Sequence, residues 1–572
     1  MKKLLVILGV LLAIAVLAAF GGILLSGRSG FWPGAPIVLV WRVTEPISEH
    51  AEGQALRLPG QPPSPSIAGL YRAFRAARED SRVRGVAVYI EDARFGLAKA
   101  QELRRQLALL REHDKFVECY LETAGEGANG TLAYFLASAC DGIRLAPAGD
   151  LNLLGLYVEG LFLRGTLDKL KIEPDFAHVG EFKSAAETFT HSEHSAAAQA
   201  AIDAVLDSDY HQLVSAIASD RELTEEAVRA LIDGAPYDAA EAERLGLVDA
   251  LAYPDEFRAH VVEQAGGEPQ LVPILEYDPP EPLVGTHEIA VVFAVGTILR
   301  GAGGPEPLSG EMILGASDLT ALLRTLREDP AVAAVVLRID SPGGSALASD
   351  LILREVELLA ADKPVVASMS DTAASGGYYI AARATKIVAE PGTLTGSIGV
   401  VGGKFVTRSF EADLLGITHD PLKRGENADI YSSQQQYSPA QSARISHLMT
   451  RVYDSFVDHV VAGRGMERAA VEAVARGRVW SGVDAHRLGL VDELGGLDRA
   501  LELATQAADL PRHARWRLAF YPEPPGFLEL LFGRGAAPGL PAQLRRALAA
   551  VERSRARVLE LPEAQRRLAS PF

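Results

Sequence analysis

The feature that most constrains the fold of this chain is an internal repeat. The segment AERLGLVD at residues 242–249 recurs as AHRLGLVD at residues 485–492, an offset of 243 positions. Further pairs of segments keep nearly this offset and the same order along the chain: residues 80–90 with 329–339, and residues 134–137 with 378–381. Because chance does not produce a collinear series of matches, the sequence predicts two copies of one unit, each of roughly 220–250 residues.

Each copy is expected to alternate strands with helices. In the second copy, short β-branched runs predict buried strands at residues 289–295, 334–339 and 364–369. Longer segments with helical spacing lie at residues 316–327, 349–359 and 440–461. This alternation favours parallel sheets covered by helices. We therefore predict an α/β fold with two tandem domains, residues 29–280 and 281–505, joined by a Pro- and Gly-bearing stretch.

Residues 506–572 are predicted to form a helical tail that has no counterpart in the first copy. Within this tail, residues 526–532 are strongly apolar, and Leu544, Leu548 and Val551 fall on one helical stripe with arginines beside it. Such a stripe predicts a docking face within the protein. The alternative is a segment that lies at a membrane surface or at the rim of an oligomer.

Composition excludes several classes of protein. The 572 residues carry a net charge of −18, which argues against a nucleic-acid partner because such partners reward a basic surface. Two cysteines, Cys119 and Cys140, are too few for a disulfide scaffold or a four-cysteine zinc site. They lie near a predicted strand and a helix end, so we expect them to be buried as small apolar side chains.

Residues 1–28 are predicted to be a membrane anchor. Lys2 and Lys3 precede an uncharged run of 22 residues, positions 4–25, which as a helix spans about 33 Å and so crosses a bilayer core. The apolar run continues past residues 18–19, which favours an uncleaved transmembrane helix over the alternative of a cleavable signal peptide. The positive-inside rule then keeps the N-terminus in the cytoplasm and places nearly all of the chain on the other side.

Two strand ends of the second copy carry glycines and small residues. Residues 340–345 (DSPGGS) follow one predicted strand, and Ser375 follows the next, just before a helix. Ligand sites form at the carboxyl ends of parallel strands. The backbone N–H of Gly376, with that of Gly344 or Gly343, would then form an oxyanion hole beside a nucleophilic serine. The alternative is that these glycines only make tight turns.

A nucleophilic serine needs a base. None of the 13 histidines lies in a recognisable triad setting, and His191 and His194 have no third ligand nearby that would make a metal site. A lysine serves as base when burial keeps it neutral near pH 7. Lysine is scarce in this chain, with 11 among the 56 basic residues. Each lysine is therefore less easily explained as a solvent-exposed residue without a specific role.

Taken together, the anchor, the repeat and four motifs resemble the signal peptide peptidase A family in its long, double-domain form, over about residues 30–505. The motifs are residues 180–184 (GEFKS), 341–344 (SPGG), 374–378 (ASGGY) and 394–399 (LTGSIG). The resemblance implies two Clp/crotonase-like domains and a Ser–Lys dyad serine peptidase without a metal, nucleotide or other cofactor. It implies that Ser375 is the nucleophile, that Lys183 is the general base and that Ser397 orients the lysine.

The same resemblance implies partners and a location. Substrates would be peptides, above all cleaved signal peptides, and the chain would assemble as a homo-oligomer, expected to be a tetramer. It would be a single-pass protein of the bacterial inner membrane, with its catalytic domains on the periplasmic side of the cytoplasmic membrane. Whether the lysine meets the serine of its own chain or of a neighbouring chain stays open.

The repeat tests this assignment independently. Aligning Tyr134 with Tyr378 puts Thr131 opposite Ser375, and residues 91–96 (EDARFG) replace the SPGG turn. Conversely, Lys183 aligns with Ala428 in the second copy. The first copy therefore lacks the nucleophile and the second lacks the base, which predicts one composite site between the copies. If the gap in the alignment of the two copies were placed differently, Lys423 would instead be the base.

The sequence is also compatible with three other functions. One is a membrane protease of the same clan that cuts particular membrane proteins. Another is a crotonase-type acyl-CoA enzyme that uses the same oxyanion loops, and the third is a non-catalytic scaffold tethered to the membrane. The anchor and the complementary loss of serine and lysine favour the peptidase over the acyl-CoA enzyme.

Overall fold

Two sheets with the same strand order form the framework of the protein. The computed structural model describes residues 35–44, 46–50, 64–277, 287–306, 309–510 and 516–523. The first sheet is parallel, in the order β8 (Ala250–Leu251), β4 (Gly142–Leu145), β3 (Phe116–Leu121), β2 (Val83–Ile90), β1 (Ile37–Val43) and β9 (Gln270–Pro273). The second contains the parallel series β20 (Glu493–Leu494), β16 (Lys386–Ala389), β15 (Val365–Ala374), β14 (Val332–Ser341), β10 (His287–Val295) and β21 (Trp516–Tyr521). The sequence repeat is thus a repeat of strand topology.

The second sheet carries two more strands beside the candidate site. Strand β17 (Leu394–Gly396) pairs in parallel with the end of β15, and β19 (Val479–Ser481) runs antiparallel to β17. Small separate sheets are formed by β11 (Thr297–Leu299), β13 (Met312–Gly315) and β12 (Gly304–Pro305), and by β5 (Asp150–Leu151) with β7 (Tyr237–Asp238).

Helices connect the strands of both sheets. Those of the first copy are α2 (Ile67–Glu79), α3 (Leu97–Arg111), α4 (Thr131–Ala137), α5 (Arg164–Lys169), α6 (Glu187–Thr190), α7 (Ala196–Asp220), α8 (Glu225–Gly234), α9 (Ala239–Arg244) and α10 (Pro254–Gln264). Those of the second are α11 (Ala316–Glu328), α12 (Ala346–Asp362), α13 (Gly376–Ala381), α14 (Pro439–Arg464), α15 (Arg468–Val474), α16 (Gly482–Arg487) and α17 (Leu497–Ala507). The start of α12 is fixed by Ser345, whose Oγ accepts the N–H of Ala348, as an N-cap serine does.

The α/β fold with parallel sheets is confirmed. The strands expected at residues 289–295, 334–339 and 364–369 lie within β10, β14 and β15, and the helices expected at 316–327, 349–359 and 440–461 lie within α11, α12 and α14. Strand β15 continues to Ala374, which is five residues further than the sequence indicated. This extension delivers Ser375 directly at the end of a central strand.

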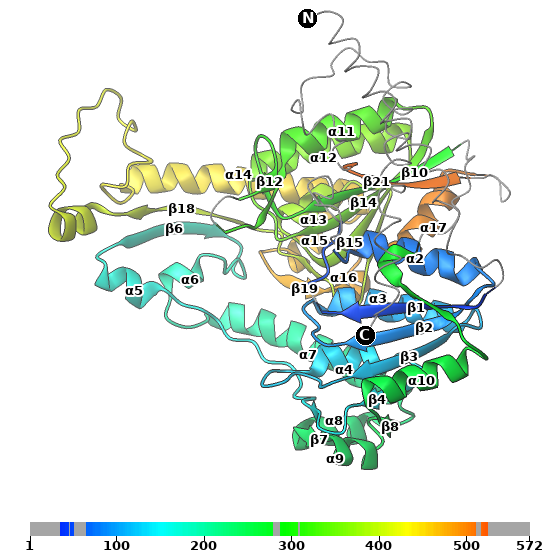
Figure 1. Cartoon of the computed structure of the whole chain (residues 1–572). Helices are drawn as coiled ribbons and strands as arrows, with labels where there is room; N and C mark the ends of the chain where they lie inside the picture. The colour runs from blue at the N-terminus through cyan, green and yellow to red at the C-terminus, as the bar shows by residue number, and fades with distance from the viewer. Residues whose placement is uncertain are drawn as a thin grey trace, which may run out of the picture.

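The copies are stacked so that helices of the first cover the second sheet. Ala68 and Tyr71 of α2 pack with Ile289 and Val291 of β10, and Leu501 of α17 belongs to the same apolar cluster. Figure 1 shows α2 and α3 between the two sheets, whereas α10 lies on the far side of the first sheet. The face of the second sheet is therefore closed only when the two copies dock.

A two-stranded ribbon also joins the copies. Strand β6 (Glu173–Val179) comes from the first copy and pairs antiparallel with β18 (Val400–Val406) from the second, with Val179 opposite Val400. The ribbon, with α14 beside it, projects away from the sheets to the left of Figure 1. Because Lys183 follows β6 and Ser397 precedes β18, this pairing brings the two residues to the same place.

The cysteine prediction is wrong in one respect. Cys119 on β3 and Cys140 beyond α4 are both buried, as expected, but they form a disulfide with their Cα atoms 5.9 Å apart. The parallel strands place β3 beside the end of the following helix, which brings together two residues that are 21 positions apart.

The predicted anchor, residues 1–28, lies outside the described residues. Among the residues that are described, none of the helices has the length and apolar character needed to span a bilayer.

The expectation for the tail is wrong for residues 516–521, which form strand β21 rather than helix. Strand β21 pairs with β10 as β9 pairs with β1, so this part of the tail has a counterpart in the first copy. Tyr521 donates a hydrogen bond to Glu288 (2.6 Å), and Arg517 pairs with the same buried carboxylate. The apolar stripe around Leu544 lies outside the described residues.

Removing β21 should therefore destabilise the second copy. A chain that ends at residue 510 loses Phe520, whose burial contributes about 2–3 kcal/mol to the unfolding free energy. It also loses Arg517 and Tyr521, the two side chains that pair with the buried carboxylate of Glu288. We expect its urea-unfolding midpoint to fall well below that of a chain ending at residue 523, which keeps the strand. Equal midpoints for the two truncations would show that β21 contributes nothing to the sheet.

Candidate active site

Ser375 lies at the junction between β15 and α13. Its backbone has φ 54° and ψ −115°, a region that residues other than glycine rarely occupy and that is often found at functional sites. Its N–H donates to Gly396 O (2.9 Å), and its own carbonyl accepts the N–H of Tyr379 (2.8 Å). The residue is therefore held by β17 on one side and by α13 on the other, with its side chain at the end of the sheet.

Strand register places the other expected groups around Ser375. Ala374 pairs with Gly396, the last residue of β17, so Ser397, which follows that strand, lies beside Ser375. Ser341 pairs with Ala373, so the turn containing Gly343 and Gly344 lies beside α13. The approach is so close that a Cβ on Gly343 would lie 2.5 Å from Gly376 N, and Gly343 has φ 101°. Only glycine fits at that position.

The expected oxyanion donors differ in availability. The N–H of Gly343 donates to Ser341 Oγ (3.1 Å) and is already engaged. In the described part of the chain, the N–H groups of Gly344 and Gly376 have no hydrogen-bond partner. These two are therefore the ones free to bind a developing negative charge.

Lys183 meets Ser375 within one chain. Its Nζ lies 2.9 Å from Ser375 Oγ, 2.9 Å from Ser397 Oγ and 3.0 Å from Ser397 O. The side chain is buried, and burial lowers the pKa of Lys183 to about 8, because a low-dielectric surrounding disfavours the charged amine. The structure thus brings together the three side chains that the sequence singled out.

Lys423, the alternative base, has contacts that do not include Ser375. Lys423 is half-exposed, and its Nζ pairs with Asp429 (2.8 Å) and contacts Glu426 O.

The repeat alignment that favoured Lys183 is also supported by a pair of equivalent contacts. Tyr134 donates to Leu247 O (2.8 Å), and Tyr378 donates to Leu490 O (2.9 Å). Thr131, opposite Ser375 in the alignment, accepts the N–H of Gly155 instead of facing a lysine.

Residues that the sequence did not single out connect the first copy to both strand ends of the site. Asp371, four residues before Ser375, accepts the N–H groups of Gly96 (3.0 Å) and Lys99 (2.9 Å) at the start of α3. The Nζ of Lys99 pairs with Asp340 (2.7 Å), directly before the SPGG turn. The first-copy loop that replaces the SPGG turn is therefore bound to β15, the strand that ends at Ser375.

A buried arginine lies at the centre of this interface. Arg338 on β14 is fully buried and pairs with Glu49 (2.8 Å) and Glu102 (2.5 Å) of the first copy. Although burial raises the pKa of Glu49, Arg338 and Lys99 together hold it at about 2. The signal in the sequence is a charged residue in the middle of an apolar strand, which a buried pair would explain.

Among the residues that the structure describes, no three His, Cys, Asp or Glu side chains are grouped as metal ligands would be. The chemistry available at the site is that of a serine hydroxyl, a buried amine and two backbone N–H donors.

Comparison with known proteins shows a family match over more than half of the chain. The family model described as peptidase family S49 matches residues 122–267 and 357–511. A chloroplastic serine protease SPPA of Arabidopsis thaliana is 33% identical over 483 residues, covering 82% of this chain and 70% of that protein. Protease 4 of Salmonella typhi is 32% identical over 486 residues, covering 82% and 75%. Among solved structures, a Listeria monocytogenes ClpP1 mutant is 15% identical, covers 37% of this chain and 94% of its own, and has a TM-score of 0.24, too low to support a conclusion.

Replacing Arg338 by methionine should destabilise the protein strongly. The substitution leaves Glu49 and Glu102 buried without their partner, which costs about 3–5 kcal/mol of unfolding free energy. Urea unfolding followed by tryptophan fluorescence measures the change. Arg164→Met is the control, because Arg164 pairs with the exposed Asp168 on α5 and the loss of such a surface pair should leave the midpoint nearly unchanged. An unchanged midpoint for Arg338→Met would contradict the importance of the buried pair.

Proposed function

The chain belongs to peptidase family S49 and is a serine peptidase, and we propose that Ser375 and Lys183 form its catalytic dyad. Membership in this family favours the peptidase over the acyl-CoA enzyme and the scaffold that the sequence left open. The observation that carries the proposal is the 2.9 Å distance between Lys183 Nζ and Ser375 Oγ, in a place where the amine is buried.

The contacts of Lys183 match the hydrogen-bonding capacity of a neutral amine. A neutral amine has two N–H donors and one lone pair. The two oxygens of Ser397 within 3.0 Å accept the two protons, so the lone pair is directed at the hydroxyl of Ser375. Ser397 therefore orients the amine through Oγ and its carbonyl, and it brings no negative charge that would hold the lysine protonated.

The reaction follows from these positions. Lys183 removes the hydroxyl proton of Ser375 while Oγ bonds to the scissile carbonyl carbon. The resulting ammonium gives this proton to the leaving amine, and the C–N bond breaks to leave an acyl-enzyme. Lys183 then takes a proton from water, whose oxygen attacks the ester. Collapse of the second tetrahedral intermediate returns the proton to Ser375 and releases the acid.

Two backbone N–H groups stabilise the oxyanion in both tetrahedral intermediates. We assign this role to Gly344 and Gly376, since the N–H of Gly343 is held by Ser341. Donors that are already oriented cost no reorganisation when charge develops, and one such donor is worth about 3–4 kcal/mol in rate.

The substrate class is proposed as signal peptides that have been cut from preproteins, together with other membrane-associated peptides. The support is the resemblance to signal peptide peptidase A and the apolar segment at residues 4–25, which would hold the site beside a membrane. The alternative is a protease of the same clan that cuts specific membrane proteins. The active-site residues would be the same in both, so profiling of the cleaved peptides is the measurement that separates them.

The proposed location is the bacterial inner membrane, with a single N-terminal span and the catalytic copies on the periplasmic side. It rests on the lysines at positions 2 and 3 and on the uncharged run that follows them. A homotetramer with inward-facing sites is proposed from the family resemblance alone.

Ser375→Ala and Lys183→Ala should each lower kcat/KM for a peptide substrate by about a thousandfold or more, because the two groups act as a unit. The double variant should be no slower than either single variant. Lys423→Ala should keep normal turnover, since this lysine pairs with Asp429 away from the site. Near-normal turnover of Lys183→Ala would contradict the assignment of the base.

The rate should rise with pH through about 8, because only the neutral amine of Lys183 accepts the proton and burial lowers its pKa to about 8. Below that value, kcat/KM should fall tenfold for each pH unit. The initial rate of Ser375 labelling by an organophosphonate, measured between pH 5 and about 10, gives the same profile without a substrate. A single step near pH 6.5 that persists in Lys183→Ala would indicate a histidine base instead.

A further inference from the structure

A turn in the second copy contacts both Lys183 and Ser397, although it is far from each in sequence. This turn, residues 475–478, connects α15 to β19. It makes three backbone hydrogen bonds with the segments that carry the two residues: Phe182 N–H to Arg476 O (2.9 Å), Ser397 N–H to Arg478 O (2.7 Å) and Gly477 N–H to Ile398 O (2.7 Å). The turn therefore links the base segment to the segment that orients the base.

Glycines allow the approach on both sides. Gly477 has φ 83°, and a Cβ there would lie 2.5–2.6 Å from the N, Cα and Cβ atoms of Lys183. Gly180 has φ 103°, and its Cβ would lie 2.4 Å from the carbonyl carbon and oxygen of Arg476. Real Cβ atoms do not come so close to backbone, so either side chain would push the two segments apart.

Side chains hold the turn against the base segment. The guanidinium of Arg478 lies 5.0 Å from the ring centre of Phe182 and 4.4 Å from that of Trp480, which is cation–π distance. The indole N–H of Trp480 donates to Val474 O (2.8 Å), at the end of α15. The residue directly before Lys183 is thus covered by the turn.

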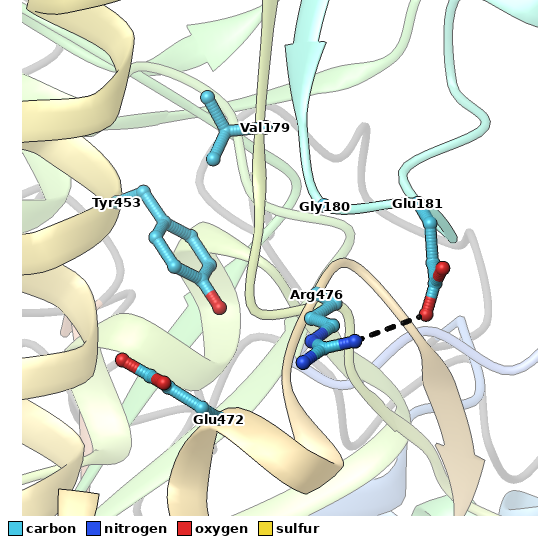
Figure 2. A pocket seen from close by; sticks show the side chains of 6 residues that line it. All are labelled: Val179, Gly180, Glu181, Tyr453, Glu472 and Arg476. Atoms are coloured by element: carbon cyan, nitrogen blue, oxygen red, sulfur yellow. Dashed lines mark hydrogen bonds and ion pairs between the residues drawn. The ribbon is translucent and has the colours of Figure 1, made fainter. Parts of the chain in front are cut away.

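Another side of the base segment, at Val179, Gly180 and Glu181, faces a pocket. The pocket has a volume of about 380 Å³, and Figure 2 shows the side chains around it. It is lined by Val179, Gly180, Glu181, Tyr453, Glu472 and Arg476. The contact drawn across its rim is an exposed ion pair between Arg476 and Glu181 (3.4 Å), which contributes little rigidity. The packed contacts described above come from the turn.

We propose that residues 475–478 are a positioning element for Lys183, and that Gly477 is the residue through which the turn fixes the amine beside Ser375. The inference deepens the proposed function and rests on Lys183 being the base. Gly477 acts by letting the turn lie directly on the backbone of Lys183, so that the amine stays buried and within reach of the hydroxyl.

Displacement of Lys183 should alter its titration, because burial is what lowers its pKa. The charged and titratable groups on the segments packed around it are His178, Glu181, Tyr453, Glu472, Arg476 and Arg478. None of them forms a direct contact with Nζ, whose partners are Ser375 and Ser397. A change in the pH profile therefore reports the burial of the amine rather than the loss of a charged partner.

The test is Gly477→Ala in the full-length protein, compared with Gly489→Ala. Gly489 has φ 80°, nearly that of Gly477, but a Cβ there would meet only Met466 Sδ at 3.7 Å. The control thus carries the same backbone strain without the clash. We expect Gly477→Ala to lower kcat at pH 7 at least tenfold with little change in KM, and to shift the pH profile upward. Each unit of upward shift lowers the rate at pH 7 about tenfold. Gly489→Ala should keep the wild-type kcat and profile.

Arg478→Met provides a second variant that adds no backbone clash, and it is decisive should Gly477→Ala not fold. It removes the guanidinium over Phe182 and should shift the profile of organophosphonate labelling in the same direction, by a smaller amount. If Gly477→Ala folds and keeps the wild-type kcat and pH profile, the positioning role is overturned. If Gly477→Ala does not fold, a wild-type kcat and pH profile for Arg478→Met overturns it.

Lys183→Ala distinguishes failure of the positioning role from failure of the proposed dyad. If Lys183→Ala retains the wild-type profile, the proposed dyad fails; if it is inactive while Gly477→Ala behaves as wild type, only the positioning role fails.

Discussion

The burial of one lysine amine at the junction of two copies is the constraint on which the rest of the site depends. An exposed lysine is protonated at pH 7 and cannot accept a proton. Neither copy alone buries Lys183, since β6 and the segment after it come from the first copy and Ser375 and Ser397 from the second. Docking of the copies therefore creates the proposed base as well as the site around it.

Docking of the two copies depends on the first-copy loop that stands in place of the glycine turn. The loop at residues 91–96 replaces the glycine turn that flanks Ser375 in the second copy. In the structure, Gly96 and Lys99 hold the carboxylate of Asp371 on the nucleophile strand. Buried charges are tolerated only when they are well paired, so such contacts permit few alternative orientations. The loop that stands in place of the glycine turn thus orients the copy that carries the proposed oxyanion hole.

Much of this arrangement could be predicted from the sequence. The repeat predicts that the two copies share one α/β topology, and the complementary presence of Ser375 and Lys183 predicts a composite site. Arg338 and Gly477 were missed because their roles depend on contacts across strand register and between distant segments, which local patterns do not encode. Strand β21 was missed because it lies beyond the last detectable repeat segment, although the alternation in WRLAFY is a weak strand signal.

Backbone strain is concentrated where the chemistry is proposed. Seven described non-glycine residues have positive φ, and three of them, Ser375, Ser397 and Arg476, lie at this site. Each is in a region that costs about 1–3 kcal/mol. Hydrogen bonds from their neighbours in the sheet and the turn sustain them: Ser375 N–H binds Gly396 O, and Ser397 N–H binds Arg478 O. The geometry of the dyad is therefore fixed by main-chain pairing at the sheet edge. A side-chain change that leaves this pairing intact should perturb the site less than one added methyl group that forces two backbones apart.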